Sequence, residues 1–517
     1  MIKNFKWLLL VSLSFVACNN DDAVINPDSS DGMALTAGSA NFSKYVALGD
    51  SFAAGYSDGA LFIKGQEGAY PNVLSQQFAL VGGGAFTTPL MSDNIGGFSM
   101  GGFQIPQFGT RLYFNGVGPV PVAGPTTTSI TAKLTGQFNN MGIPGAKSFH
   151  LVTPGYATLN PYFGRFATPS GTTVLADALA QAPTFFSLWI GGNDVLTYAT
   201  SGGIGVNQTG NINAASYGSN DITDPNVFAG AYSALVNGLT VNGAKGVVAN
   251  LPYVNTLPYF TTVPFNPLTS KVLGTGSTAV GDATIDALNT QLYGPLKAAL
   301  TAFQAGDRIN LLSKTVANPL LIKDESLTNL SAQLTAAFTP SLGAQTAAFY
   351  GAVFGQARQA TATDLVVLPT QTAIGAAPTA SDSGVGFAPP SPLNKFGITF
   401  PLQDKHVLIA TEVAEIKVAT DAYNVSIKAI ADSKGLAFVD TKVVMDKLGK
   451  GGITANGYTV TSAYVTGGAF SLDGVHPSPR GYALIANKFI EAINMTYGSN
   501  LKGVDLSNYR ILFPKSL

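Results

Sequence analysis

The segment YVALGDSFAAGY, residues 45–56, carries the clearest signals of fold and chemistry in this chain. It is an apolar run of strand type that stops at Gly49, and Asp50 and Ser51 follow, where a serine can cap and open the next element. Parallel α/β sheets carry their sites at such strand ends, because the N–H groups at the start of the following helix point outward and favour developing negative charge. Ser51 is therefore the candidate nucleophile, although Gly-Asp-Ser taken alone also describes an ordinary turn.

The composition describes a large globular protein with few charges. Of 517 residues, 46% are hydrophobic and only 11% are charged, while 58 glycines predict long uncharged loops. This length allows two or three domains, or one α/β domain with long insertions. The net charge is -1 and no basic run follows the N-terminus, so nucleic acid is not an expected partner.

The N-terminus has the pattern of a targeting segment. Lys3 and Lys6 precede an apolar stretch, residues 7–17, that is too short to span a bilayer comfortably, and Cys18 is the only cysteine of the chain. The end of this stretch resembles the lipobox of bacterial lipoproteins, although it has Phe15 where leucine is commoner. The resemblance implies a signal peptide over residues 1–17 and a lipidated Cys18; an ordinary secretory signal with an unrelated cysteine is the alternative.

The residues after the cysteine suggest where the protein resides. The sequence NNDD, residues 19–22, resembles the surface-export tag of lipoproteins from the Bacteroidetes group. Residues 18–40 lack hydrophobic periodicity and predict a flexible tether. We therefore expect a protein of the cell envelope, anchored to the outer membrane by its N-terminal lipid and exposed at the surface.

Strands and helices alternate along the rest of the chain, which predicts a parallel sheet covered on both faces. The expected helices cover residues 70–80, 174–181, 225–243, 285–303 (interrupted by Pro295), 407–434 and the segment after Ser478, and the expected strands cover 184–190, 246–251, 308–312, 365–368 and 436–439. Insertions are expected near 81–135, 200–222 and 314–400 in a domain spanning 41–497, with a C-terminal tail over 498–517. Apolar residues between 327 and 338 suit a packed helix or an interfacial lid, and the proline-rich segment 252–267 suits a rigid linker or a substrate-facing loop.

Two glycine-bearing turns supply candidate oxyanion ligands. The turn around Gly145 lets a backbone N–H approach a ligand closely. The apolar strand 184–190 runs into Gly191-Gly192-Asn193-Asp194, where the Asn193 amide can donate to an oxyanion. Each segment alone is equally described as a turn, and an Asx turn capping the next helix accounts for Asn193 or Asp194.

A carboxylate and an imidazole lie close together near the C-terminus. Asp473 and His476 share a short loop before a helix that Ser478 and Pro479 begin. A serine hydroxyl becomes a good nucleophile when an imidazole accepts its proton, and the imidazole needs a carboxylate on its other nitrogen. His150 and His406 have no comparable carboxylate in a loop, so His476 is the candidate base.

A second serine also matches a hydrolase motif. Ser99 lies in Gly97-Phe98-Ser99-Met100-Gly101, which fits the G-x-S-x-G nucleophile elbow of α/β-hydrolases. That elbow needs a hydrophobic strand immediately before it, and residues 91–96 are not one. Ser51 therefore remains the preferred nucleophile.

Taken in order, these segments resemble the four blocks of the GDSL (SGNH) hydrolase family: Gly49-Asp50-Ser51, Gly145, Gly192-Asn193-Asp194 and Asp473-x-x-His476. Phe52 stands where the family name implies leucine. The resemblance implies a three-layer, flavodoxin-like α/β fold with long insertions. It also implies that Ser51 is the nucleophile, His476 the base and Asp473 its orienting partner, with the Ser51 and Gly145 amides and the Asn193 side chain binding the oxyanion.

The activity expected from this resemblance is hydrolysis of carboxylic esters, as in a lipase or esterase, through an acyl-enzyme and without a metal or cofactor. The same fold serves carbohydrate O-acyl esterases, so acetylated glycans are an alternative substrate. A non-catalytic surface-binding lipoprotein is a third interpretation, against which the complete set of Ser51, Asp473 and His476 argues.

Overall fold

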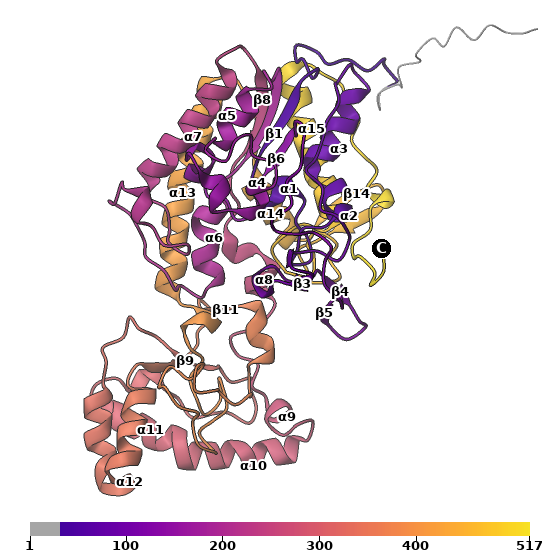
Figure 1. Ribbon diagram of the computed structural model, residues 1–517. Coiled ribbons are helices and arrows are strands. Elements are labelled where there is room, and N and C mark those ends of the chain that lie inside the picture. Colours follow the sequence, from indigo (N-terminus) through magenta and orange to yellow (C-terminus); the bar gives the residue numbers. More distant parts are fainter. Residues whose placement is uncertain (1–31) are drawn as a thin grey trace, which may run out of the picture.

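The computed structural model describes residues 32–517 (Figure 1). The predicted signal peptide, Cys18 and most of the predicted tether lie outside this range. A central sheet of five strands has the order β13-β8-β7-β1-β6, and every neighbouring pair is parallel. Its strands are β1 (Tyr45–Gly49), β6 (Asn140–Gly142), β7 (Phe185–Trp189), β8 (Lys245–Ala249) and β13 (Ala437–Val439).

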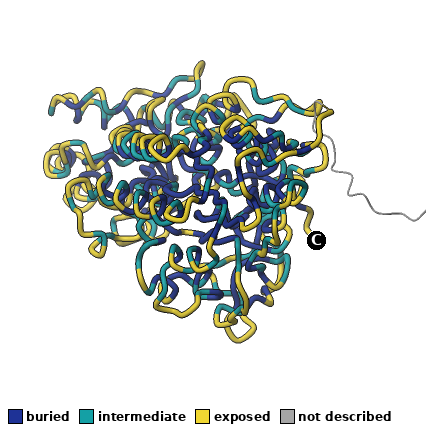
Figure 2. The backbone as a smooth tube through the Cα atoms, turned by 90° about the horizontal axis from the view of Figure 1, so that it is seen from above, coloured by how far each residue is buried: buried dark blue, intermediate teal, exposed yellow. Residues whose placement is uncertain are grey.

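Helices cover both faces of this sheet, which gives three layers (Figure 1). One face carries α3 (Tyr70–Ala79) and α15 (Pro479–Tyr497), and the other carries α5 (Val174–Leu179), α7 (Pro225–Thr240) and α13 (Ala410–Ser433). Nearly all strand residues are buried, because both faces are covered and the strands are correspondingly apolar (Figure 2). The predicted α/β class with a parallel sheet between helices is confirmed.

The strand order places a topological switch beside the segment 45–56. Numbered along the chain, the five strands lie in the order 2-1-3-4-5, so the chain moves to one side of β1 for β6 and then to the other side for β7. The loops after β1 and β7 therefore diverge at the carboxyl edge of the sheet. Open α/β sheets bind their ligands in the crevice that this divergence leaves.

The remaining elements are short or peripheral. They are α1 (Ser51–Ala54), α2 (Ile63–Glu67), α4 (Pro161–Gly164), α6 (Asn193–Thr200), α8 (Pro258–Thr261), α9 (Ser270–Leu273), α10 (Thr278–Leu288), α11 (Gly294–Ala302), α12 (Ser331–Phe354), α14 (Thr441–Gly449), and the strands β2 (Ser99–Met100), β3 (Phe103–Gln104), β4 (Leu112–Phe114), β5 (Pro119–Pro121), β9 (Leu321–Lys323), β10 (Ala357–Gln359), β11 (Leu365–Val366), β12 (Val407–Leu408), β14 (Ile453–Ala455) and β15 (Tyr458–Val460). No helix in residues 32–517 combines the length and the apolar character needed to cross a bilayer.

Three expected elements differ in the structure. Residues 140–142, interpreted as part of a turn, form the edge strand β6, which is too short to show a period of two. Residues 308–312 form no strand; the nearest strand is β9. The helix expected over 285–303 is divided into α10, a π-helical turn (Asn289–Tyr293) and α11, which begins next to Pro295.

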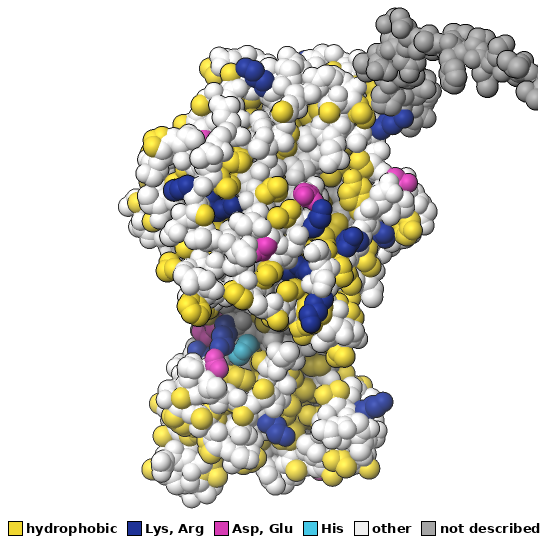
Figure 3. Space-filling model, turned by 45° about the vertical axis from the view of Figure 1, so that its right-hand side comes forward, with side chains coloured by type: hydrophobic (Ala, Val, Ile, Leu, Met, Phe, Trp, Pro, Cys, Tyr) yellow, Lys and Arg dark blue, Asp and Glu magenta, His cyan; other side chains and the backbone are white. Residues whose placement is uncertain are grey.

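A second hydrophobic core lies outside the sheet domain. Its buried residues fall between Val263 and Ile409, and they form the lower lobe of Figure 1. A narrower waist joins the two lobes (Figure 3). Leu334 and Phe338 of α12 are buried in this core, so the apolar spacing after residue 327 belongs to a packed helix.

Candidate functional site

The structure brings together the three residues predicted to form a triad. The Ser51 hydroxyl lies 2.8 Å from His476 Nε2, and His476 Nδ1 lies 2.9 Å from Asp473 Oδ2. An ionised carboxylate only accepts hydrogen bonds, so Nδ1 carries the proton and donates it to Asp473. Nε2 is then unprotonated and accepts from the Ser51 hydroxyl, which is the arrangement that a general base requires.

Asp473 is held as an anion. Burial by itself raises the pKa of this carboxyl, but the His476 imidazole and hydrogen bonds from His476 and Val475 outweigh it, and the pKa is lowered. Oδ1 accepts from the backbone N–H groups of Val475 and His476, at 2.9 and 2.8 Å. The three-residue spacing thus lets the loop supply two hydrogen bonds to its own carboxylate from adjacent backbone groups.

A glycine allows the nucleophile to lie at the sheet edge. Asp50 caps α1 by accepting a hydrogen bond from the Phe52 N–H, and Ser51 is the first helical residue. A Cβ on Gly142 of β6 would lie 2.2 Å from the Ala54 nitrogen, so only glycine lets α1 pack this closely against β6. The Asp50 carboxyl is buried, which raises its pKa to about 7. Its structural role is to cap the N-terminus of α1.

The predicted oxyanion ligands lie on loops that leave adjacent strands. Gly49 of β1 pairs with Gly142 of β6 on one side and with Trp189 of β7 on the other. Gly145 has a φ of 80°, which favours glycine and turns the loop after β6. The Asn193 amide donates one hydrogen to the Ala146 carbonyl at 3.0 Å, which joins the two loops and leaves its second hydrogen for a ligand.

Asp194 holds the same loop through hydrogen bonds to Ser148. Its carboxylate accepts hydrogen bonds from the Ser148 N–H and from the Ser148 hydroxyl, both at 2.8 Å, and it is fully buried. Desolvation raises the pKa of Asp194. Asn193 and Asp194 thus hold the residues that follow Gly145, through Ala146 and Ser148. The sequence had left the role of these two residues open between oxyanion binding and an Asx turn.

A segment that sequence reasoning missed supports the acidic residue of the triad. The Gly59 N–H donates to Asp473 Oδ2 at 2.9 Å, so this oxygen has a second donor besides the imidazole. The Asp58 N–H donates to the Ser471 hydroxyl, and Asp58 Oδ1 accepts from the Leu472 N–H, both at 2.9 Å. The contacts span more than 400 positions, and nothing in the local pattern at residues 57–59 predicts them.

Asp58 is a buried carboxyl with one unpaired oxygen. It is 1% exposed, and Oδ2 has no hydrogen-bond partner among residues 32–517. Burial is the main cause that raises its pKa to about 7. The ionised form is therefore disfavoured in the folded state.

We expect Asp58→Asn to stabilise the protein increasingly as the pH rises from about 4 to 7. Below about pH 4 the carboxyl is protonated in both folded and unfolded chains; between its unfolded pKa and about 7 only the unfolded chain ionises, which lowers wild-type stability. Asparagine keeps the acceptor for Leu472 and tolerates the φ of 52°. Chemical denaturation across this range gives the free energy of unfolding of the variant and of wild type. The difference between the two should grow to a few kcal/mol at most and stay constant above pH 7. A difference independent of pH would contradict the assignment.

The other predicted candidates lie elsewhere. The Ser99 hydroxyl donates to the Thr128 carbonyl at 3.2 Å within the short hairpin β2-β3, and no strand precedes it as the elbow requires. His150 Nδ1 accepts from the Lys147 N–H, and His406 Nδ1 accepts from the Gln403 N–H. Burial lowers the pKa of both histidines to about 4. Residues 32–517 contain no group of three or more His, Cys, Asp or Glu side chains placed to hold a metal ion.

The proline-rich segment 252–267 connects the sheet domain to the second lobe and also contacts the site. The Tyr259 N–H, in α8, donates to the Gly474 carbonyl at 2.9 Å, between the two acid-base residues of the loop. Burial raises the pKa of Tyr259 to about 12. The segment therefore joins the lobes and supports the loop of Asp473 and His476.

Comparison of the chain with protein-family models, with curated proteins and with solved structures gives no match.

Proposed function

We propose that this chain is a serine hydrolase of the GDSL (SGNH) family that cleaves carboxylic esters through an acyl-enzyme intermediate. The observation that carries the proposal is the continuous hydrogen-bonded series from Ser51 through His476 to Asp473. Three groups from opposite ends of a 517-residue chain adopt the order that nucleophilic catalysis requires. The strand order 2-1-3-4-5 supports the proposal, because it is the flavodoxin-like order that the family resemblance implies.

The proposed reaction has two acyl transfers. Ser51 Oγ attacks the ester carbonyl while His476 Nε2 takes its proton, and the imidazolium that forms is stabilised by Asp473. The C–O bond to the alcohol breaks as His476 returns the proton to the leaving oxygen. Water then attacks the acyl-enzyme with the same base, which releases the carboxylic acid and regenerates Ser51. The N–H groups of Ser51 and Gly145 and the Asn193 amide stabilise the oxyanion in both steps.

The proposed location follows from the N-terminal sequence. A lipid on Cys18 would anchor the enzyme to the outer membrane, with the hydrolase domain facing outward from the cell. The anchor would keep the site near lipid and glycan esters of the envelope. The charge of -1 gives the chain no general attraction to anionic surfaces.

Labelling with a fluorophosphonate tests the proposal directly. The Ser51 oxygen should displace fluoride from phosphorus and form a stable adduct, which peptide mass spectrometry locates on Ser51. Wild-type protein should be labelled and Ser51→Ala protein should not. Absence of an adduct on Ser51 in folded wild-type protein would refute the proposed function.

Asn193→Ala should lower kcat by about a hundredfold to a thousandfold, because one oxyanion donor is lost. KM should change little, since the interaction is made mainly in the transition state. The hydrogen bond to Ala146 is lost as well, so thermal unfolding of the variant must be compared with wild type. Unchanged kcat would remove Asn193 from the oxyanion site.

A further inference from the structure

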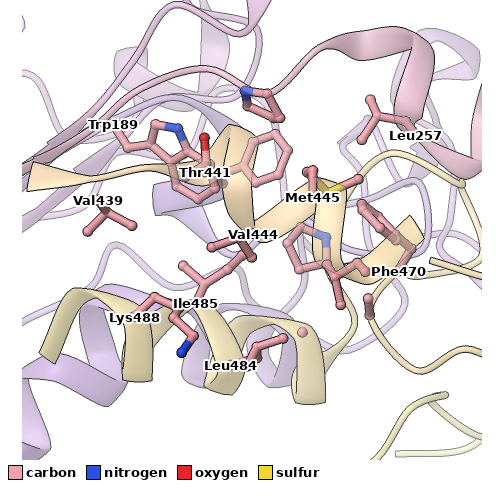
Figure 4. Close-up of a pocket in the computed structure, with 16 residues that line it drawn as sticks. Trp189, Leu257, Val439, Thr441, Val444, Met445, Phe470, Leu484, Ile485 and Lys488 are labelled. Carbon is pink, nitrogen blue, oxygen red and sulfur yellow. The ribbon is translucent and has the colours of Figure 1, made fainter. Parts of the chain in front are cut away.

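Figure 4 shows an apolar cavity whose lining includes the sequence neighbours of two proposed catalytic residues. Phe52 follows the nucleophile in sequence, Pro477 follows the base, and both line the cavity, as does Trp189 at the end of β7. The Phe52 ring lies 5.3 Å from the His476 ring and 4.9 Å from the Trp189 ring, between centroids. Phe52 therefore lies in the wall of the cavity that is nearest to the catalytic base.

The walls of the cavity offer almost no polar partner to a ligand. Side chains of α14 and α15, including Val444, Met445 and Leu484, form the side away from the sheet (Figure 4). The Thr441 hydroxyl and the Trp189 indole N–H both donate to the Asn250 carbonyl, at 2.6 and 3.1 Å. A sugar or glycerol hydroxyl would lose its hydrogen bonds to water here, whereas a hydrocarbon chain would gain from burial.

The size of the cavity indicates that it accommodates only a short hydrocarbon chain of a ligand. Its volume is about 50 Å³. By this measure about 10–15 Å³ holds one water molecule, so the cavity accommodates roughly three to five groups of methylene size. Lys488 lies at its outer end, where the ammonium pairs with Glu491 at 2.7 Å.

We propose that this cavity binds the acyl chain of the ester and that Phe52 sets the accepted chain length; the inference rests on the proposed function. The acyl chain stays covalently bound to Ser51 after the alcohol leaves, so it is the part of the substrate that would occupy an apolar cavity beside the nucleophile. The alcohol must depart before water attacks, and in lipids and acylated glycans it is the polar part. Short acyl groups fit beside Phe52, and longer chains are excluded by its ring.

Alkylphosphonate p-nitrophenyl esters of increasing alkyl length test this proposal on the full chain. Attack by Ser51 forms the O–P bond and releases p-nitrophenolate, so the rate constant of labelling can be followed by absorbance. Wild-type protein should react fastest with alkyl groups of about three to five carbons, the number that the cavity volume accommodates. In Phe52→Ala the optimum should move to longer chains, with about a fourfold gain in relative rate for each additional methylene that is buried.

A matched pair of variants on α14 provides the control. Val444 lines the cavity, whereas its neighbour Val443 is 48% exposed and does not. Val444→Trp should lower the rates of butyl and longer probes at least tenfold relative to the methyl probe, and Val443→Trp should keep the wild-type profile.

The outcomes separate the two proposals. No reaction of wild-type Ser51 with any probe refutes the proposed function. Reaction with the methyl probe, combined with chain-length profiles that Phe52→Ala and Val444→Trp leave unchanged, overturns the acyl site alone. A profile that instead follows the length of the alcohol in a series of acetate esters also overturns it.

Discussion

Ser51→Ala should lower kcat for a soluble ester by about five to six orders of magnitude, to the level of the oxyanion site acting on bound substrate. The reason is that no other hydroxyl lies within hydrogen-bond distance of His476 Nε2 among residues 32–517. Without Oγ no acyl-enzyme forms, and direct attack by water must replace two easier steps with one difficult step. KM should stay near the wild-type value, because the substrate pocket is unchanged.

Hydrolysis of p-nitrophenyl butyrate by purified protein is the measurement. Ser99→Ala is the matched control, since Ser99 lies in the alternative G-x-S-x-G motif. Its hydroxyl donates a hydrogen bond to the Thr128 carbonyl. That control should retain wild-type turnover. Activity retained in Ser51→Ala, or lost in Ser99→Ala with folding intact, would transfer the nucleophile to another residue.

Asp473→Asn should lower kcat by about four orders of magnitude. An asparagine amide turned toward His476 offers a donor where Nδ1 needs an acceptor, so the imidazole would adopt the tautomer that protonates Nε2. Such a ring cannot accept the Ser51 proton. The backbone contacts of the loop favour retention of the fold, since the carboxamide oxygen can still accept from Val475 and His476.

The rate of fluorophosphonate labelling should fall in Asp473→Asn together with kcat, because both reactions use the same base. Thermal unfolding of the variant gives the control for folding. A loss of less than tenfold in both kcat and labelling rate would contradict the proposed role of Asp473 in orienting the His476 imidazole. A loss in hydrolysis without a loss in labelling would place Asp473 in a later step than attack by Ser51.

Local sequence was sufficient for much of the fold. Helices α3, α7, α13 and α15 and strands β7, β8 and β13 were expected within a few residues of their bounds, because the helices have long periodic apolar patterns and the strands lie in continuous apolar runs. Edge strand β6 and the second core around residues 263–409 were not expected. Three residues cannot show a period, and a separate core is defined by contacts between short segments that are distant in sequence.

Local sequence specifies the chemistry of the site: a serine after a strand, an Asp-x-x-His loop and two glycine turns, each with its local geometry set by near neighbours. The meeting of Ser51 and His476, the hydrogen bond from Gly59 to Asp473 and the apolar cavity lined by Phe52 all arise from the tertiary fold. The physical reason is that hydrogen bonds within a turn depend on a few adjacent dihedral angles. Contacts across more than 400 residues depend instead on the order of strands in the sheet, which no short segment encodes.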